Sequence, residues 1–149
     1  MPFQIGVFEA TALVYPLTAR TGDEELRKML NFLREAGIPL ILISTEPKEF
    51  ITDLERLGIA GYFERFFLGV SDRQVIINEV LRRYPRVDLR DVFYVDIEPE
   101  GIADASKAKI VPFALFGKKH TLPEMQAAGA KWAVHSYQDL TSILRANIA

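Results

Sequence analysis

Short apolar runs alternate with amphipathic segments along the whole chain, and this alternation limits the fold more than any other feature of the sequence. Six runs are rich in β-branched and aromatic residues, and each is short enough to form a strand that is buried on both faces. The segments between them carry helical patterns, and the connections are too short for antiparallel excursions. The sequence therefore predicts an α/β domain with a doubly wound, mainly parallel sheet and helices on both faces. The expected strands span residues 3–8, 40–43, 66–68, 92–95, 110–116 and 132–134.

Start and stop signals mark the helices between the predicted strands. Thr21 and Glu24 form a capping box before an apolar helix face that ends at Gly37. Thr121 and Glu124 repeat this box later in the chain. The same kind of signal predicts further helix starts at Thr45, Ser71, Pro99 and Ser136, and helix ends at Gly58, Pro85 and Gly129.

Length and composition are those of one globular domain over residues 1–149. A chain of this size can bury about two-thirds of its unfolded surface in one core. Its 18 Lys and Arg against 20 Asp and Glu give a net charge of -2, which provides no positive field for binding nucleic acid. Without cysteine, the chain has no disulfide, thiolate nucleophile or Cys-based metal site. Since it also lacks a signal peptide and an apolar run long enough for a bilayer, we expect a soluble, cytoplasmic protein without membrane association.

Candidate functional residues follow the strands, because ligands of doubly wound sheets bind outside the carboxyl ends of the strands. These positions hold Glu9 and Thr11, Ser44 and Thr45, and the segments 69–74, 96–101 and 117–121. Neither G-x-G-x-x-G nor G-x-x-x-x-G-K-S/T occurs in the sequence. The sequence therefore disfavours a Rossmann dehydrogenase and a P-loop enzyme.

Three of these strand ends carry longer patterns. Residues 7–14 read V-F-E-A-T-A-L-V, residues 41–47 read I-L-I-S-T-E-P, and residues 95–105 read V-D-I-E-P-E-G-I-A-D-A. Together they resemble the haloacid dehalogenase-like superfamily of hydrolases and phosphatases. That family has V-F-D-x-D-G-T-L at the first place, Ser or Thr at the position of Ser44, and V-D-D-S-P-E-N/D-I-x-x-A at the third. The resemblance covers nearly the whole chain and implies the three-layer, Rossmann-like fold of this family.

The resemblance implies a chemistry in which the first Asp of motif one attacks phosphorus and the Asp two residues later acts as acid and base. Glu9 stands at the nucleophile position, where its carboxylate reaches one methylene further out. Thr11 stands at the acid/base position and cannot exchange protons as a carboxylic acid does. The Lys of motif three falls near Ser71, and Arg73 is the nearest cation that could replace it. The candidate catalytic residues are therefore Glu9, Thr11, Ser44 and Arg73.

The fourth motif, which completes the Mg²⁺ site of the family, can be aligned in two ways. In the first, Ile97 replaces the metal-binding Asp and Gly101 replaces the second acidic residue, so that Mg²⁺ loses its main ligands. In the second, Asp96 and Glu100 reproduce the spacing of the two acids and serve as metal ligands. The resemblance thus implies Mg²⁺ as cofactor if the protein is active, and no cofactor if it is not.

Members of this family that act on small metabolites usually carry a cap domain after the first motif or before the third. Here the segments 10–21 and 69–74 are too short for a cap. The resemblance therefore implies a core without a cap domain. Such cores act on macromolecules or need a neighbouring subunit to close the site. The resemblance therefore leaves a homo-oligomer as one alternative.

Three functions fit these residues. The first is a domain with lost or strongly attenuated phosphohydrolase activity, which acts by binding a protein partner or a phosphorylated ligand. The second is a Mg²⁺-dependent phosphatase with Glu9 as nucleophile and the acids of the second alignment as metal ligands. The third is a flavodoxin-like binder of a phosphorylated ligand at an edge formed by Ser44, Thr45 and Lys118.

The candidates also have structural explanations. Glu9 can be a polar strand end, Ser44 a helix cap, and Asp96 a carboxylate that accepts backbone amides at the start of a helix. The residues Trp132, His120 and His135 are interpreted as structural, and the segment 117–120 as a solvated loop. Core packing between helix and strand is expected to explain most of the four aromatic residues Tyr62, Phe63, Phe66 and Phe67.

Overall fold

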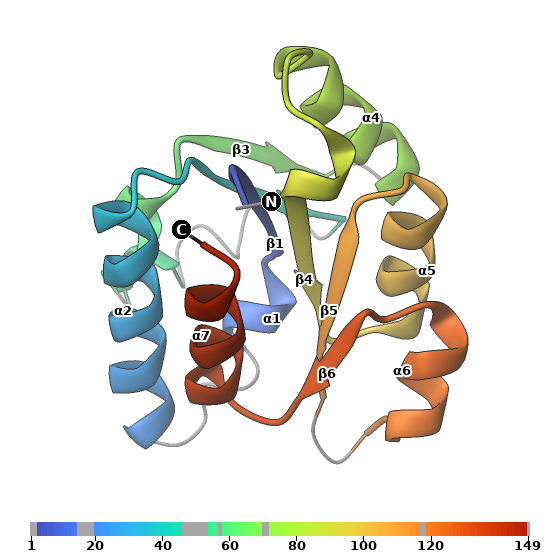
Figure 1. Cartoon of the computed structure of the whole chain (residues 1–149). Helices are drawn as coiled ribbons and strands as arrows, with labels where there is room; N and C mark the ends of the chain where they lie inside the picture. Colours follow the sequence, from blue (N-terminus) through green and yellow to red (C-terminus); the bar gives the residue numbers. More distant parts are fainter. Residues whose placement is uncertain are drawn as a thin grey trace.

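Six parallel strands form one sheet in the computed structural model of the chain (Figure 1). The structure describes residues 3–14, 20–45, 54–56, 58–69, 72–116 and 119–148. The strands are β1 (Ile5–Glu9), β2 (Leu40–Ser44), β3 (Arg65–Leu68), β4 (Val92–Asp96), β5 (Val111–Leu115) and β6 (Trp132–Val134). Their order is β3-β2-β1-β4-β5-β6, and every neighbouring pair is parallel. The doubly wound sheet predicted from the sequence is confirmed.

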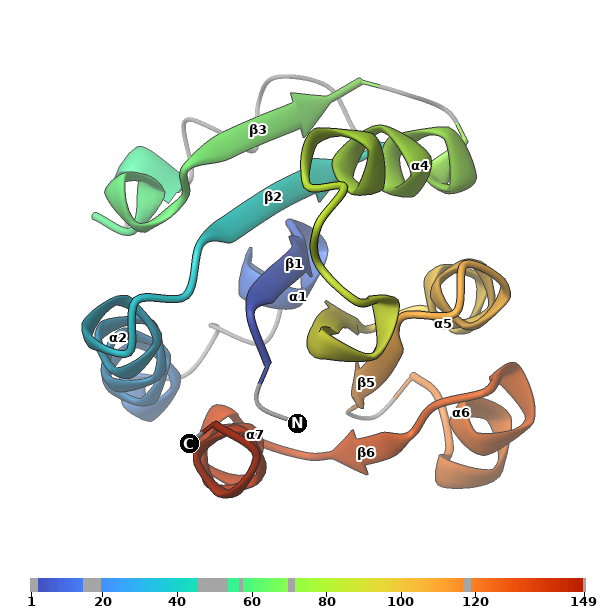
Figure 2. The ribbon, with the colours of Figure 1, turned by 45° about the horizontal axis from the view of Figure 1, so that its top comes forward.

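Helices cover both faces of the sheet (Figure 2). The helices are α1 (Thr11–Val14), α2 (Arg20–Glu35), α4 (Arg73–Arg83), α5 (Pro99–Lys107), α6 (Leu122–Ala128) and α7 (Tyr137–Ala146), with short 3₁₀ helices at Ala60–Tyr62 and Leu89–Asp91. One face packs against α1, α2 and α7, and the other against α4, α5 and α6. Successive strand residues point to opposite faces. Phe8 of β1 therefore belongs to the cluster under α2 and α7, and Val7 to the cluster under α4 and α5.

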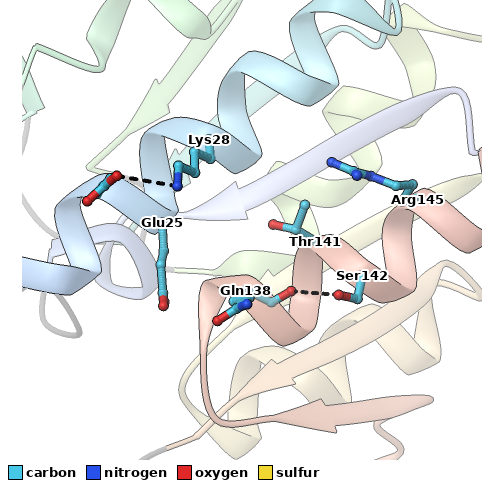
Figure 3. A pocket seen from close by; sticks show the side chains of 7 residues that line it. Glu25, Lys28, Gln138, Thr141, Ser142 and Arg145 are labelled. Atoms are coloured by element: carbon cyan, nitrogen blue, oxygen red, sulfur yellow. Dashed lines mark hydrogen bonds and ion pairs between the residues drawn. The ribbon is translucent and has the colours of Figure 1, made fainter.

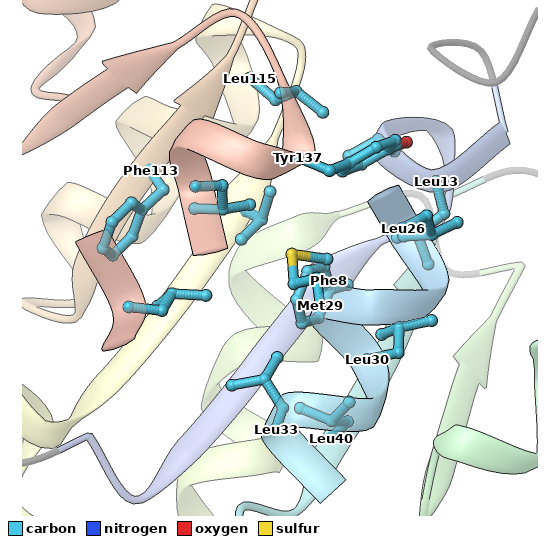
Figure 4. Close-up of a cluster of buried hydrophobic side chains, with 14 of the residues drawn as sticks. Phe8, Leu13, Leu26, Met29, Leu30, Leu33, Leu40, Phe113, Leu115 and Tyr137 are labelled. Atoms are coloured by element: carbon cyan, nitrogen blue, oxygen red, sulfur yellow. The ribbon is translucent and has the colours of Figure 1, made fainter. Parts of the chain in front are cut away.

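The larger apolar cluster lies between the sheet and the helices α2 and α7 (Figure 4). Phe8, Phe93 and Phe113 stand on the adjacent strands β1, β4 and β5, with successive ring centroids 5.7 Å and 6.0 Å apart in edge-to-face contact. Burial of a side chain of this size contributes about 1.5–3 kcal/mol. This packing holds β1 and β4 together, and these strands end at Glu9 and Asp96.

Most helix signals of the later part of the chain are confirmed. Thr121 and Glu124 form the predicted capping box of α6, and Gly129 closes that helix with a left-handed φ of 107°. Pro99 lies in the first turn of α5. Ser136 caps α7, where its hydroxyl accepts the amide of Asp139 at 3.0 Å.

Other boundaries differ from the predicted ones. The cap of α4 is Asp72 rather than Ser71, because the Asp72 carboxylate accepts the amide of Gln74 at 2.9 Å. β1 begins at Ile5, since the preceding amides donate to backbone oxygens outside the sheet. β5 is confined to Val111–Leu115. The side chain of Thr21, the residue Ser71 and the start of the helix expected after Thr45 lie outside the described residues and side chains. The end of that helix is described: residues 54–56 are helical, Leu54 is buried, and Gly58 follows with a left-handed φ of 73°.

The predicted core role of the four aromatic residues is confirmed for three of them. Phe63 is buried, while Tyr62 and Phe67 are partly buried against the two main clusters. Phe66 is 38% exposed, because it lies on β3 at the edge of the sheet. Trp132 stacks on Phe113 with ring centroids 4.9 Å apart, which agrees with its structural interpretation.

The connections near the first and third motifs are short. Ten residues join β1 to α2 (10–19), and four join β3 to α4 (69–72), too few for a cap domain. Among the helices that the structure describes, none has the length and apolar character needed to span a bilayer.

Candidate functional site

An open cleft of about 580 Å³ lies at the carboxyl ends of the strands. Of the predicted site residues, Glu9, Thr11, Thr45, Arg73 and Glu100 line this cleft. Its remaining wall is formed by Glu98, Pro99, Lys119 and His120. The parallel topology has therefore brought together residues from five different segments of the chain.

Glu9 and Thr11 form the floor of the cleft on the β1 side. Glu9 is the last residue of β1 and is 1% exposed, and its Oε1 lies 3.5 Å from the amide nitrogen of Thr11. The Thr11 hydroxyl is buried, and no described residue is its hydrogen-bond partner. A buried hydroxyl without a partner is unfavourable by about 1–3 kcal/mol.

Arg73, the first residue of α4, extends its side chain over the acidic residues. Its Nε lies 3.8 Å from Oε2 of Glu9 and 3.7 Å from Oδ2 of Asp96, and its Nη1 lies 3.8 Å from Oε2 of Glu100. Burial lowers the pKa of Arg73, but the nearby charges, that of Asp96 first, outweigh burial and raise the pKa above its usual value. Arg73 is therefore charged and lies where a replacement for the motif-three Lys was predicted.

Asp96, the last residue of β4, is fully buried, and both oxygens of its carboxylate accept hydrogen bonds from the protein. Oδ1 accepts the amides of Ile97 at 2.6 Å and Glu98 at 2.9 Å, and Oδ2 accepts the hydroxyl of Tyr94 at 2.6 Å. Burial raises the pKa of Asp96 from 3.8 to about 6, although the Tyr94 hydroxyl, the amides and Arg73 oppose this change. Asp96 thus holds the start of α5 in place, as its structural explanation predicts.

Gly101 leaves the space into which the Asp96 carboxylate points. A Cβ at Gly101 would overlap the Asp96 carboxylate and lie 2.9 Å from the Tyr94 hydroxyl. The space that a second acidic side chain would need at this position is therefore filled by Asp96. Ile97 packs against the apolar cluster on the α2 and α7 face.

The described residues offer few free side-chain oxygens for the Mg²⁺ that the resemblance implies. Mg²⁺ requires oxygen ligands in near-octahedral geometry. The oxygens of Asp96 already accept three hydrogen bonds, Ile97 and Gly101 offer no side-chain oxygen, and the Glu100 side chain is 90% exposed beside Arg73. Within the described residues, no three His, Asp or Glu side chains are arranged to hold a metal ion. We therefore derive no metal-dependent step for this site.

The structure describes the second motif only as far as Thr45. Ser44 ends β2 and is buried, and its backbone oxygen accepts the amide of Gly69 at 3.0 Å. Thr45 follows it and lines the cleft. Lys118, the third member of the predicted phosphate-binding edge, lies outside the described residues. The structure therefore brings Ser44 and Thr45 to the sheet edge, and the role of Lys118 stays a prediction.

His120 is the site residue that was interpreted as merely structural. Its Nε2 lies 3.0 Å from Oε2 of Glu98, and its Nδ1 lies 3.1 Å from Oε2 of Glu124. Lys119 reaches the other oxygen of Glu98 at 3.3 Å. A sequence signal exists for one of these contacts, because Glu124 of the capping box follows His120 by four residues. The contact with Glu98 has no local signal.

A second groove of about 410 Å³ lies between α2 and α7 (Figure 3). Side chains of Lys28, Gln138, Thr141 and Arg145 line it. The Lys28 ion pair with Glu24, at 3.3 Å, is exposed on both sides, and such pairs contribute little. We therefore take the cleft at the strand ends as the candidate site.

Asp96 makes stability depend on pH in a defined direction. Because the pKa of Asp96 rises from 3.8 to about 6 on folding, the folded chain holds more protons than the unfolded chain between these values. The contribution of Asp96 to the free energy of unfolding therefore falls as the pH rises from about 4 to about 6, by about 3 kcal/mol for a change of about two pKa units. In Asp96→Asn we expect this pH-dependent fall in the free energy of unfolding to be absent. Urea unfolding of both proteins between about pH 4 and pH 7 measures the difference, and a difference that stays constant with pH would contradict the buried carboxylate.

Comparisons with known proteins bear on this fold. Scans against protein-family models and against curated proteins find no match for this sequence. Solved structures do match. A Thermotoga maritima protein provisionally named a β-phosphoglucomutase superposes with a TM-score of 0.80 at 15% identity, over 97% of this chain and 99% of that chain.

Two further solved structures agree with the first. A predicted phosphatase from Clostridium acetobutylicum matches with a TM-score of 0.78 at 13% identity, over 98% of this chain and 100% of that chain. A haloacid dehalogenase-like family hydrolase from Streptococcus pneumoniae matches with a TM-score of 0.73 at 9% identity, over 95% and 98%. The six-stranded parallel sheet and its helices are thus shared over nearly the full length of these proteins. The chain has the fold of the haloacid dehalogenase-like phosphatases and hydrolases.

Proposed function

We propose that this domain has lost, or nearly lost, phosphohydrolase activity and acts by binding a ligand or a protein partner at the cleft. The observation that carries this proposal is the use of both Asp96 oxygens by the Tyr94 hydroxyl and two backbone amides. A carboxylate held in this way supports the start of a helix instead of a metal ion. Gly101 reinforces this arrangement, because it leaves room for Asp96 and supplies no oxygen of its own.

The β1 side of the cleft supports the same proposal. Glu9 carries its carboxylate one methylene further out than Asp, and a misplacement of about 1 Å can cost roughly 10²-fold in rate. Thr11 replaces a general acid and base with a hydroxyl that does not exchange its proton near neutral pH. These two changes are chemically separate from those at Ile97 and Gly101.

The cleft itself is suited to binding. Its volume of about 580 Å³ falls within the range of about 300–1,000 Å³ that small-molecule sites occupy. Arg73 and Lys119 offer hydrogen-bond donors there. A phosphorylated or carboxylated ligand matches these donors.

The second function, a Mg²⁺-dependent phosphatase that uses Glu9, draws support from one arrangement. Glu9 and Arg73 lie together in the cleft, as a nucleophile and its charge-balancing cation would. In that case the metal ligands must come from a rearranged Asp96 and Glu100. Activity and metal binding therefore separate the two functions.

We expect wild-type protein to show no hydrolysis of a generic aryl phosphate above that of Glu9→Gln, with or without Mg²⁺. Isothermal titration calorimetry should show no Mg²⁺ binding to wild type and measurable binding to the double variant Glu9→Asp, Ile97→Asp, which restores two family residues. Thermal shift with phosphate-bearing ligands then tests binding at the cleft, because a ligand at 100 times its Kd stabilises the folded state by about 2.7 kcal/mol.

Turnover by wild type that requires Mg²⁺ and is abolished by Glu9→Gln would establish the phosphatase instead. Equal Mg²⁺ binding by wild type and by the double variant would also contradict the proposed loss of the metal site. Circular dichroism of each variant serves as the control for folding.

A further inference from the structure

His120 links two loops of the sheet edge through its imidazole ring. Its Nε2 lies 3.0 Å from Oε2 of Glu98, which is the N-cap residue of α5 and follows β4. Its Nδ1 lies 3.1 Å from Oε2 of Glu124, which is in the first turn of α6 and follows β5. The side chain is 18% exposed and lines the cleft. One ring thus joins the loop after β4 to the loop after β5.

The two contacts of His120 with carboxylates require a proton on both ring nitrogens. A neutral imidazole has one N–H donor and one bare nitrogen, whereas a carboxylate can only accept. With neutral His120, one of the two contacts would place a nitrogen lone pair against a carboxylate oxygen. Only the protonated ring donates to both carboxylates, in two charge-assisted hydrogen bonds. The observed geometry therefore corresponds to the charged form of His120.

The two carboxylates are not held equally by other groups. Glu124 also accepts the amide and the hydroxyl of Thr121 in the capping box, so it stays in place whatever the charge of His120. Among the residues that the structure describes, Glu98 has Lys119 as its one further cationic partner, and that side chain is 77% exposed. Loss of the proton therefore weakens the contact with Glu98. The other charged groups that line the cleft with His120 are Glu9, Arg73 and Glu100.

We propose that Glu98, His120 and Glu124 form a proton-operated latch, which holds Glu98 in place at one wall of the cleft while His120 is charged and releases Glu98 when the ring loses its proton. The latch concerns access to the cleft and does not depend on which ligand or partner the cleft binds. Its effector is the pH of the surroundings. The cleft is expected to widen as the pH rises.

The charges around His120 place this change in a defined pH window. The hydrogen bond with Glu124 raises the pKa of His120 above its usual range, burial opposes this, and Glu98 raises it further. A group whose pKa is raised by folding stabilises the folded state below its unfolded pKa, about 6.5, and loses this contribution as the pH passes the folded pKa. The latch therefore opens above about pH 6.5.

NMR titration of the ring resonances of His120, together with the side-chain carboxyl carbon of Glu98 and the backbone amide of Lys119, tests the latch. We expect the side-chain carboxyl carbon signal of Glu98 to change with the same midpoint as the ring, and this midpoint to lie above 6.5. The backbone amide of Glu98 donates to Asp96 and therefore also follows the charge of Asp96. Glu98→Gln should shift the ring midpoint to lower pH, because the partner charge is lost. The matched control is Glu79→Gln. The side chain of Glu79 is 29% exposed, compared with 30% for Glu98, and Glu79 forms ion pairs with arginines on its own helix α4 instead of with His120.

The control should leave the ring midpoint of His120 unchanged. The latch is wrong if the side-chain carboxyl signal of Glu98 does not change at the His120 midpoint. It is also wrong if Glu98→Gln and Glu79→Gln give the same midpoint as wild type. These outcomes are independent of phosphatase activity, so failure of the latch and failure of the proposed function can be told apart.

Discussion

Arg73→Met is expected to destabilise the domain by about 3–5 kcal/mol at neutral pH, which is a large part of a typical unfolding free energy of 5–15 kcal/mol. The side chain of Arg73 is 15% exposed and lies within 4 Å of the carboxylates of Glu9 and Asp96, which are themselves buried. Methionine keeps much of the packing of the arginine stem but removes the charge. Two buried carboxylates then lose the cation that they share. Urea unfolding of both proteins measures the change.

The matched control for this prediction is Arg82→Met. Arg82 lies on the same helix and pairs with Glu79 at 2.6 Å, but its side chain is 76% exposed, so a loss of at most about 1 kcal/mol is expected. Adding Glu9→Gln to Arg73→Met should restore part of the stability, because one of the two buried charges is removed. Equal losses in Arg73→Met and Arg82→Met would show that Arg73 does not balance the charge of the cleft.

Gly101→Ala is expected to destabilise the domain by about 3 kcal/mol. Helix propensity alone favours alanine over glycine by up to about 1 kcal/mol at this position in α5, so the sign of the effect decides between local and tertiary causes. The added Cβ would overlap the Asp96 carboxylate, which three hydrogen bonds hold in place. The overlap outweighs the gain in propensity. Chemical denaturation measures the result.

Gly61→Ala provides the control, because a Cβ at Gly61 would meet nothing within 4 Å. We expect its stability to stay within about 0.5 kcal/mol of wild type. Asp96→Ala combined with Gly101→Ala should cost less than the sum of the two single changes, since the overlap is gone. A Gly101→Ala protein as stable as wild type would mean that Asp96 is not locked by Tyr94 and the amides, and this would reopen the metal site.

Local patterns were sufficient to predict much of the fold. The strand over 132–134 and the starts of α5, α6 and α7 agree with the structure, because capping and alternation act between residues close in sequence. The cap of α4 was wrong by one residue, since Ser71 and Asp72 are both good capping residues and pattern alone does not rank them. Phe66 is the exception to the predicted core packing, because the edge position of β3 depends on strand order, which no local pattern contains.

The candidate site was predicted only as a set of positions. Strand ends identified Glu9, Thr11, Thr45, Arg73 and Glu100, and the structure places all five in one cleft. The sequence left two alignments for the fourth motif, and neither showed how the Asp96 oxygens are used. His120 had no recognised partner, because Glu98 is 22 residues away from it.

The sequence by itself determined the class of fold and the edge of the sheet where a site must lie, because side-chain periodicity and caps are properties of neighbouring residues. Only the tertiary structure decided what that edge can do. The approach of Arg73 to Glu9 and Asp96 follows from the order of β1 and β4 in the sheet and from the start of α4. The direction of the Asp96 carboxylate follows from the space above Gly101 and from the Tyr94 hydroxyl. Packing between distant segments, which no local pattern encodes, therefore sets the hydrogen-bond partners of Asp96 at the start of α5.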